Sequence, residues 1–271
     1  MPGTAADPLA RVTVVTVAYN SAGVLPGFLD SCPAGLRVIV VDNASHDGSA
    51  ALAEARGARV IRLPENRGFG AGCNAGMEQA ATEFTLLANP DSRLSRDAIA
   101  ALVAAADAFP DAAILAPLIR DAGGARARSW DASQRRRRML DRKRQAEPWP
   151  EGPLCVEFAS GACLLVRASA GLRFDERLFL YYDDDDLCES ARAAGHSILL
   201  VPDAAVTHAG GGSSTPSGGL TRFKAHHMAL SRLIHMAKHQ GEAEARAEAR
   251  ARLLHHAGKA IGHALTLRPR K

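Results

Sequence analysis

The stretch Val12-Thr13-Val14-Val15-Thr16-Val17-Ala18 decides the fold of this chain, together with the polar Tyr19-Asn20-Ser21 that follows it. Its β-branched residues predict a buried strand, and the polar residues predict a loop that leads into a helix at 24–31. Residues 37–41 repeat this pattern before Asp42-Asn43. Buried strands that alternate with helices are typical of a parallel sheet with helices on both faces.

The same alternation continues along the chain. Further strands are expected at 59–63, 83–88 and 112–117. Helices are expected at 48–56, 70–81 and 96–108, and from about residue 220 onward. A second block of alternating strand and helix is expected at 156–166, 179–194 and 197–201. The predicted fold class is therefore α/β, a mostly parallel Rossmann-like sheet flanked by helices, with C-terminal helices.

The composition fits an ordinary globular protein, because 47% of the 271 residues are apolar and the length suits one large α/β domain. No apolar run approaches the roughly 20 residues that cross a bilayer, and residues 1–10 do not resemble a secretory signal. We therefore expect a cytoplasmic protein. The five cysteines are odd in number and never form a CxxC pair, so we expect reduced, mostly buried thiols.

Polar residues follow three of the predicted strands, as Tyr19-Asn20, Asp42-Asn43 and Asn89-Pro90-Asp91. Open parallel sheets bind ligands at the carboxyl ends of their strands, so these loops predict one binding edge. A carboxylate such as Asp42 can accept the imide N–H of uracil or thymine. The alternative for Asp42 and Asn43 is a local turn made by the side chain.

A succession of short motifs extends this picture. They are Asn66-Arg67-Gly68-Phe69-Gly70-Ala71-Gly72-Cys73-Asn74-Ala75-Gly76, Leu87-Ala88-Asn89-Pro90-Asp91, Phe158-Ala159-Ser160-Gly161-Ala162 and residues 174–188. Together with the two strand ends they resemble the family 2 glycosyltransferases, which have the GT-A fold, over most of residues 11–235. Asn89-Pro90-Asp91 and the Tyr-Tyr-x-Asp-x-Asp-Leu pattern at 181–187 resemble the bacterial rhamnosyltransferase branch, which uses dTDP-rhamnose for cell-surface polysaccharides.

The resemblance implies an inverting, metal-dependent enzyme. It would move a sugar, rhamnose by this likeness, from a dTDP- or UDP-sugar to the hydroxyl of a glycan or lipid-linked acceptor in cell-surface polysaccharide synthesis. The GT-A domain would cover residues 1–219, with a donor half at about 11–118, a basic loop at about 121–150 and an acceptor half at about 151–219. Residues 220–271 would form a helical extension.

The resemblance also implies a set of residues that bind the nucleotide-sugar. They are Thr16, Ala18, Tyr19, Asn20, Asp42, Asn43, Arg67, Gly68, Asn74, Asn89 and Asp91. Thr16 and Ala18 would line the base pocket. Gly68, Gly70, Gly72 and Gly76 permit a close approach of backbone N–H groups to phosphate. Two neighbouring residues, Ser45 and Asp47, are expected to cap the helix at 48–56.

Asp91 is the expected ligand of a divalent metal, Mg²⁺ or Mn²⁺, which would neutralise the departing nucleoside diphosphate. Many relatives have Asp-x-Asp here, and this chain has Asn89 in place of the first acid. His208 matches the family's second metal ligand. A type I turn with Pro90 at its second position is the local alternative.

Four consecutive acids, Asp183 to Asp186, are expected at the start of a helix, where negative charge is favoured. By the resemblance, Asp184 is the base that takes a proton from the acceptor hydroxyl. Asp183 stands where most relatives have Glu and is a second catalytic candidate. Ser160 and Gly161 are expected on the acceptor side. Asp186 is expected either to bind acceptor or to cap the helix.

Basic residues are concentrated in 126–144, and seven of the ten histidines follow Thr221, although the net charge is only +4. The first stretch is expected to be a mobile loop that closes over the donor diphosphate or touches anionic lipid. A nucleic-acid patch is the alternative, and we expect no nucleic-acid partner. The tail predicts an amphipathic helix that packs on the domain or lies on the inner face of the plasma membrane.

A homodimer is a further possible partner. Two rival functions also stay open. A sugar-nucleotide nucleotidyltransferase would use a similar core and metal, but a basic Gly-rich signature after the first strand is replaced here by Tyr19-Asn20-Ser21. A non-catalytic nucleotide-sugar binding module would explain Asn89, whereas Asp91, Asp184 and His208 favour an enzyme.

Overall fold

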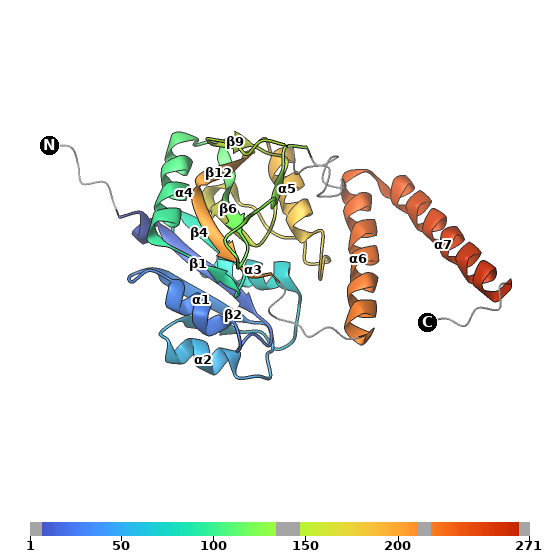
Figure 1. Cartoon of the computed structure of the whole chain (residues 1–271), viewed down its shortest axis with the longest axis horizontal. Helices are drawn as coiled ribbons and strands as arrows, with labels where there is room; N and C mark the ends of the chain where they lie inside the picture. The colour runs from blue at the N-terminus through green and yellow to red at the C-terminus, as the bar shows by residue number, and fades with distance from the viewer. Residues whose placement is uncertain (1–6, 134–146, 211–217, 266–271) are drawn as a thin grey trace.

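A computed structural model describes residues 7–133, 147–210 and 218–265. One half of its main sheet is parallel, with the strand order β3-β2-β1-β4. These strands are β1 (Val12–Ala18), β2 (Arg37–Asp42), β3 (Arg59–Arg62) and β4 (Phe84–Ala88). They are linked by α1 (Leu25–Ser31), α2 (Ser49–Ala55) and α3 (Phe69–Glu78), as Figure 1 shows. This half follows the expected alternation closely.

The other half of the sheet is mixed. β11 (Cys163–Arg167) runs antiparallel between β4 and β6 (Ala112–Arg120). β12 (Ser197–His208) is parallel to β6 and antiparallel to the short β5 (Ser92–Arg93). The expected α/β sheet with flanking helices is confirmed, but the reversed β11 makes it less parallel than we expected. α4 (Arg96–Ala108) packs on this half.

Shorter elements surround the sheet. They are η1 (Pro8–Arg11), β7 (Arg126–Ala127), β8 (Trp130–Asp131), β9 (Leu154–Cys155), β10 (Phe158–Ala159) and η3 (Ala168–Ala170). β8 pairs with β10, and both residues of β8 are buried. The start of the basic stretch is therefore packed, which corrects the expectation of a loop throughout 126–144. The run Arg135–Arg138 lies outside the described residues.

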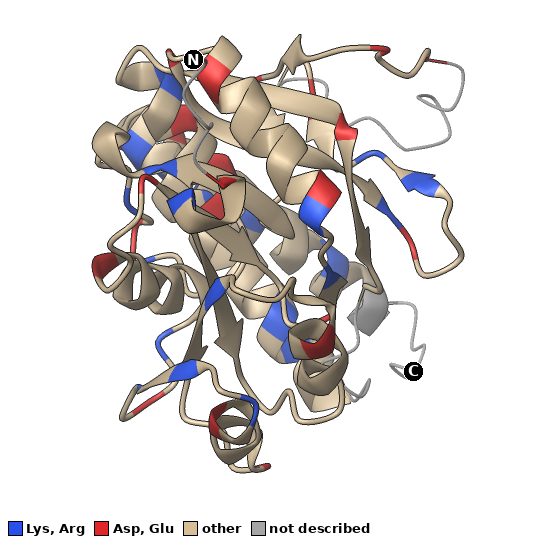
Figure 2. Cartoon of the chain, turned by 90° about the vertical axis from the view of Figure 1, so that its left-hand side faces the viewer, with Lys and Arg blue, Asp and Glu red and all other residues tan. Residues whose placement is uncertain are grey.

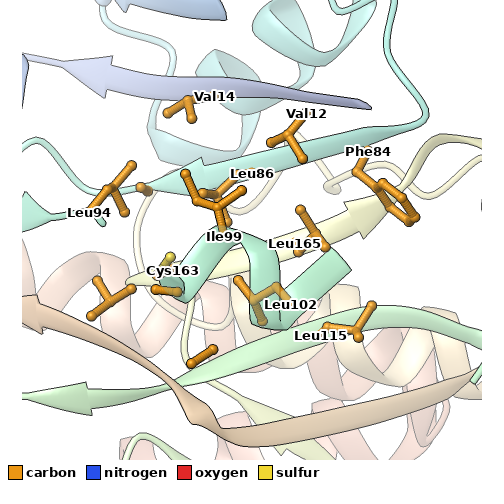
Figure 3. Close-up of a cluster of buried hydrophobic side chains, with 14 of the residues drawn as sticks. Val12, Val14, Phe84, Leu86, Leu94, Ile99, Leu102, Leu115, Cys163 and Leu165 are labelled. Carbon is orange, nitrogen blue, oxygen red and sulfur yellow. The ribbon is translucent and has the colours of Figure 1, made fainter. Parts of the chain in front are cut away.

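Two apolar clusters hold the sheet, one on each face. On one face, side chains of β1, β4 and β11 meet α4, as Figure 3 shows for Val12, Val14, Phe84, Leu86, Ile99, Leu102 and Leu165. On the other face, Val15, Val17, Leu87 and Leu164 meet α3 and α5 (Asp183–Ala193). Successive side chains of a strand point to opposite faces of the sheet, and both faces are covered here. All seven residues of β1 are therefore buried.

The glycines of α3 serve this packing. A Cβ atom on Gly72 would lie 2.7 Å from a methyl of Val17, and one on Gly70 would lie 2.8 Å from Cβ of Phe174. Gly76 faces the side chain of Val15 in the same way. Gly72 and Gly76 therefore seat α3 on β1, and Gly70 allows Phe174 to pack on the start of the helix; their expected approach to phosphate stays a prediction.

All five cysteines are free, and Cys73, Cys163 and Cys188 are buried. Burial raises the pKa of Cys163 to about 12, so its thiol stays protonated at neutral pH. Cys155 is exposed and Cys32 is half-buried. The expectation of reduced, mostly buried thiols agrees with this arrangement.

The chain ends in two long helices, α6 (Gly218–His239) and α7 (Glu242–Leu265). α6 stands beside α5, and α7 extends away from the sheet domain (Figure 1). α7 exposes the large apolar side chains Leu253, Leu254 and Ile261. Among the described residues, no helix has both the length and the apolar composition to cross a membrane.

On the opposite side of the molecule, positive and negative residues are interspersed along the helices and loops (Figure 2). Ion pairs between opposite charges include Arg11 with Asp107, Arg62 with Glu54 and Arg96 with Asp7. Among the described residues, this side therefore presents mixed charge and not a single basic field.

Candidate active site

A cleft of about 1800 Å³ opens over the carboxyl ends of β1, β2 and β4. Its floor comes from the strand ends and from the turn between β10 and β11, and α6 forms a further wall. Site candidates that line it are Tyr19, Asn43, Gly68, Asn89, Asp91, Ser160, Gly161, Asp183, Asp184 and His208. The expected binding edge and the expected acid run thus share one cavity.

Asp91 and His208 come together through strand pairing. β5 follows Asp91 directly, and its Ser92 is the antiparallel partner of His208 in β12. Nε2 of His208 lies 3.1 Å from Oδ1 of Asp91 and 3.1 Å from Nδ2 of Asn89. A carboxylate oxygen and an imidazole nitrogen at this separation form a donor pair that fits a divalent cation.

Asp184 is held in the first turn of α5 by two backbone N–H groups. Its Oδ2 accepts a hydrogen bond from N of Gly161 at 3.1 Å, and its Oδ1 accepts one from N of Asp185 at 3.0 Å. The carboxylate is half-buried and lines the cleft. The predicted base and the predicted acceptor loop, 23 residues apart in sequence, are therefore in direct contact.

The entry to α5 is conformationally strained. Tyr181 and Tyr182 have φ values of 68° and 63°, in the left-handed region that bulky residues rarely adopt. Both side chains line the cleft. Gly68, itself at φ 88°, lies against the backbone of Phe179, where a Cβ atom would collide with the carbonyl oxygen. Strain of this kind collects at functional sites, where the surrounding structure enforces it.

Asp186 does not reach the cleft. It is fully buried, its Oδ2 accepts from Nζ of Lys238 at 2.8 Å, and its Oδ1 lies 2.7 Å from Nε2 of His239. Both partners belong to α6. The expectation that Asp186 binds acceptor or caps the helix is therefore wrong, because its oxygens are occupied in fastening α6 to α5.

Asn43 lines the cleft, but its side chain organises the neighbouring loop. Oδ1 of Asn43 accepts from N of Arg67 at 2.9 Å. Its Nδ2 donates to Oδ1 of Asn66 at 2.9 Å and to the carbonyl of Gly68 at 3.0 Å. The Asn-Arg-Gly motif is thus tied to the end of β2, and Asn43 positions the Gly68 turn.

Arg67 and Asn74, two expected donor-site residues, both contact the segment that precedes α5. The guanidinium of Arg67 pairs with Glu176. The amide of Asn74 is buried and accepts from N of Phe174 at 3.0 Å, while its Nδ2 donates to O of Phe174 at 3.0 Å and to Glu176 at 3.1 Å. Neither residue lines the cleft, so the structure places them in a clamp on the segment that precedes α5.

Thr16, Ala18 and Asn20 likewise lie outside the cleft lining. Thr16 and Ala18 are fully buried, and Ala18 belongs to the apolar cluster on the α4 face. Val17, whose side chain points to the opposite face of the sheet, lines the cleft instead. Asn20 is exposed at φ 51°, and its Oδ1 accepts from N of His46 at 2.9 Å. Ala18 is the register partner of Asp42, so Thr16, Ala18 and Asp42 lie on the same face of the sheet, and the role of Thr16 and Ala18 in a base pocket stays a prediction.

Asp42 is the last residue of β2; like Thr16 and Ala18 it is outside the cleft lining, and it is 5% exposed. Its Oδ1 is buried and has no hydrogen-bond partner among the described residues. A buried acceptor without a donor is costly, so this oxygen favours a ligand that brings an N–H group.

The two expected helix caps behave differently. Ser45 accepts from N of Asn20 at 2.9 Å and does not cap α2, which is a correction. Asp47 does serve the start of α2, because its Oδ1 accepts from N of Ser49 at 3.0 Å. Burial acts to raise the pKa of Asp47, but hydrogen bonds from Ser49 and Ala22 outweigh it and lower the pKa.

The α6 wall of the cleft was missed from sequence. Its lining residues are Gly219, Leu220, Phe223, Lys224, Met228, His235 and, after the helix, Gln240. Phe223 packs edge-to-face against Phe179 with ring centroids 5.8 Å apart, and the tilted ring of His227 lies 4.6 Å from that of Phe179. The amphipathic pattern of the tail pointed to a packed face, but nothing in it identified the cleft as the partner.

Comparisons with known proteins agree with this geometry. A model of the family described as Glycosyl transferase family 2 matches residues 13–169. An N-acetylglucosaminyl-diphospho-decaprenol L-rhamnosyltransferase of Mycobacterium tuberculosis is 33% identical over 233 residues, covering 72% of this chain and 75% of the relative. This match extends over the larger part of both chains.

Solved structures share the fold at low identity. S. aureus TarS 1-349 in complex with UDP-GlcNAc matches with a TM-score of 0.58 and 18% identity, over 87% of this chain and 69% of that one. Mannosyltransferase PcManGT from Pyrobaculum calidifontis, in complex with GDP-Man and Mn²⁺, matches with a TM-score of 0.56 and 19% identity, over 98% and 84%. The expected GT-A fold is confirmed, and the chain belongs to glycosyl transferase family 2.

Proposed function

We propose that this glycosyltransferase is an inverting rhamnosyltransferase that uses dTDP-rhamnose and a lipid-linked glycan acceptor. The observation that carries the proposal is the juxtaposition, in one cleft, of the Asp91–His208 pair with an Asp184 carboxylate held by Gly161. The choice of sugar is supported by the name of the M. tuberculosis relative and by the motifs at 89–91 and 181–187.

In this proposal the donor binds at the strand ends. The free oxygen of Asp42 would accept the imide N–H of the thymine ring. Asp91 and His208 would hold Mg²⁺ or Mn²⁺, and Asn89 in place of a second acid leaves the site with one negative charge fewer. When bound, the ion stabilises the negative charge that develops on the leaving nucleoside diphosphate.

The acceptor side is organised around Asp184. An acceptor hydroxyl over Ser160 and Gly161 would donate its proton to the Asp184 carboxylate as its oxygen attacks the anomeric carbon. The two backbone N–H groups on Asp184 fix the direction of that carboxylate before the reaction. Attack from the side opposite the nucleotide is a single displacement, so the anomeric configuration inverts. Asp183, which also lines the cleft, is the second candidate base.

A lipid-linked acceptor requires access to a membrane surface. α7 presents Leu253, Leu254 and Ile261 beside basic residues such as Arg250 and Lys259. An exposed apolar stripe with flanking cations suits the surface of an anionic bilayer. We therefore place the protein at the inner face of the plasma membrane, with α7 against the lipid.

A donor panel tests the proposal. The purified protein is mixed with dTDP-rhamnose, UDP-sugars or GDP-sugars, with Mg²⁺, Mn²⁺ or chelator, and thermal stability and donor hydrolysis are measured. We expect dTDP-rhamnose with metal to give the largest shift and Asp91→Ala to abolish the metal-dependent part. A preference for UDP- or GDP-sugars would refute the rhamnose assignment. Binding without hydrolysis or transfer to any prenyl-diphosphate glycan would favour a non-catalytic binding module.

A further inference from the structure

A second group of potential metal ligands lies where α5 meets α6, apart from the Asp91–His208 pair. Glu189 projects from α5, while His235 and His239 are one turn apart on α6 and therefore share a face. Nε2 of His235 lies 3.2 Å from Oε2 of Glu189. One ligand atom from each of the three residues lies within 4.8 Å of the others.

These separations suit a shared cation. Zinc bonds to imidazole nitrogen and carboxylate oxygen are about 2.0–2.2 Å long, so two ligands in a tetrahedral site stand roughly 3.4 Å apart. The distance from Nδ1 of His239 to Oε1 of Glu189 is 3.9 Å. That distance is too long for a hydrogen bond, so a direct hydrogen bond does not account for the approach of these two atoms.

Asp186 supports His239 from the other side of its ring. Its Oδ1 lies 2.7 Å from Nε2 of His239, and Asp186 is fully buried. A carboxylate at this nitrogen favours the tautomer with a proton on Nε2, which leaves the lone pair of Nδ1 directed toward Glu189. This pairing of carboxylate and imidazole is the usual way in which proteins orient a metal-binding histidine.

The charges around the cluster favour an added cation. Three carboxylates, Asp175, Asp186 and Glu189, lie within reach of Lys238 or the two histidines. Among the described residues, two cationic side chains pair with these carboxylates, Lys238 and also Arg177, which pairs with Asp175. One negative charge is left in a partly buried place, and either a protonated histidine or a metal ion would compensate it.

We propose that Glu189, His235 and His239 bind a transition metal ion, Zn²⁺ by preference, which fastens α6 to the catalytic helix α5. Two imidazoles and one carboxylate match the ligands of zinc and cobalt better than those of Mg²⁺. Glu189 and His235 line the cleft, so the ion has a path of entry. The first turn of α5 carries Asp184, so the ion would stabilise the helix that presents the base.

Metal titration of the full-length, untagged protein tests this site. The chain is stripped with a chelator, and Zn²⁺ or Co²⁺ is titrated in the Asp91→Ala background to remove the other candidate site. We expect one equivalent of Zn²⁺ to bind and to raise Tm, Co²⁺ to give a visible absorption band of a nitrogen and oxygen site, and Mg²⁺ to have neither effect.

Variants assign the binding to these residues. Glu189→Gln keeps the side-chain size and is expected to weaken Zn²⁺ binding at least tenfold, and His235→Ala to abolish it. Asp186→Asn, a change in the positioning residue, is expected to weaken it roughly 10- to 100-fold. His255→Ala with His256→Ala, at an exposed histidine pair on α7, is the matched control and should change nothing.

Two results would overturn the proposal. If the Asp91→Ala protein takes up no Zn²⁺ at micromolar concentration, a protonated histidine supplies the missing charge instead. If Glu189→Gln binds Zn²⁺ as tightly as its parent, the ion sits elsewhere. Should His235→Ala fail to fold, Glu189→Gln still decides the question, because it alters one ligand atom without opening a cavity.

Discussion

The two sides of the cleft are built by different forces. The sheet wall, which carries Asn89, Asp91, Gly161 and His208, is fixed by strand pairing over two apolar clusters. The helix wall is α6, in which only Ser231 and His235 are buried among the described residues. α6 is held by polar contacts, such as the hydrogen bond that Oγ of Ser231 donates to the carbonyl of Leu180 at 2.9 Å, and by edge-to-face and tilted ring contacts with Phe179.

This difference separates two tasks. Groups that must be placed to within a fraction of an ångström sit on the sheet wall, where a shift would require rearrangement of a close-packed core. The helix wall depends on charged and aromatic side chains whose strength varies with pH, salt and bound ions. We therefore expect changes on the sheet wall to alter chemistry or global stability, and changes on the helix wall to act locally.

The largest effect is expected at the junction of the two walls. Asp184→Asn keeps the shape of the side chain but removes the base, and it retains an oxygen for only one of the two backbone N–H groups, those of Gly161 and Asp185. Transfer should fall about 10²- to 10⁴-fold, while the Kd for donor, measured by calorimetry, stays within about twofold. Asp203→Asn, at an exposed carboxylate of β12, is the control. A parallel loss of donor affinity would mean that Asp184 serves binding and not proton transfer.

The next effect compares one leucine in each region. Leu165 of β11 is fully buried and pairs with both Leu86 and Leu115, so Leu165→Ala should lower the free energy of unfolding by about 2–5 kcal/mol. Leu254 of α7 is 73% exposed, and Leu254→Ala should change it by less than about 0.5 kcal/mol. Urea denaturation measures both. A comparable loss for Leu254→Ala would show that α7 is packed in solution.

Sequence patterns were most informative where structure is set by neighbours along the chain. The alternation of buried strand and helix located β1, β2 and α4 to within a residue, because burial on both faces requires a continuous apolar run. The reversed direction of β11 was not accessible, since an isolated apolar run is the same for a parallel and an antiparallel partner. Strand direction depends on the connection, which the pattern does not specify.

The residues of the candidate site also differ in whether the sequence could identify their roles. Asp91 and Asp184 could be found because each belongs to a matched motif close to the boundary of an element, Asp91 directly before β5 and Asp184 in the first turn of α5. The roles of Asn74 and Asp186 could not, because their partners lie 100 and 52 to 53 residues away. The sequence does not distinguish a buried asparagine or aspartate from an exposed one. Only the tertiary contacts showed that both serve as clamps.

A smaller, local effect is expected on the helix wall. Lys238→Met removes the ammonium that bonds Asp186 at 2.8 Å and leaves that buried carboxylate with fewer donors. The contact between α6 and α5 should weaken by about 1–3 kcal/mol. Hydrogen exchange should accelerate in α6 and stay unchanged in β1 and β4. Lys259→Met on α7 serves as the control. Equal acceleration in β1 would contradict the independence of the two walls.

The smallest effect concerns pH. Burial, with the nearby His226, lowers the pKa of His227, whose ring packs against those of Phe179 and Phe223. The unfolded chain therefore binds this proton more readily than the folded one. The stability that His227 contributes is complete above the ordinary histidine pKa of about 6.5 and declines as pH falls below it.

His227→Gln should therefore flatten the decrease of Tm between pH 7.5 and pH 5.5 slightly, whereas His256→Gln on α7 should leave it unchanged. NMR titration of the His227 ring gives the direct measurement. A pKa above that of the exposed His256 would reverse the sign of the effect. It would mean that the rings of Phe179 and Phe223 stabilise an imidazolium, as a cation over an aromatic face does, and that α6 tightens on acidification.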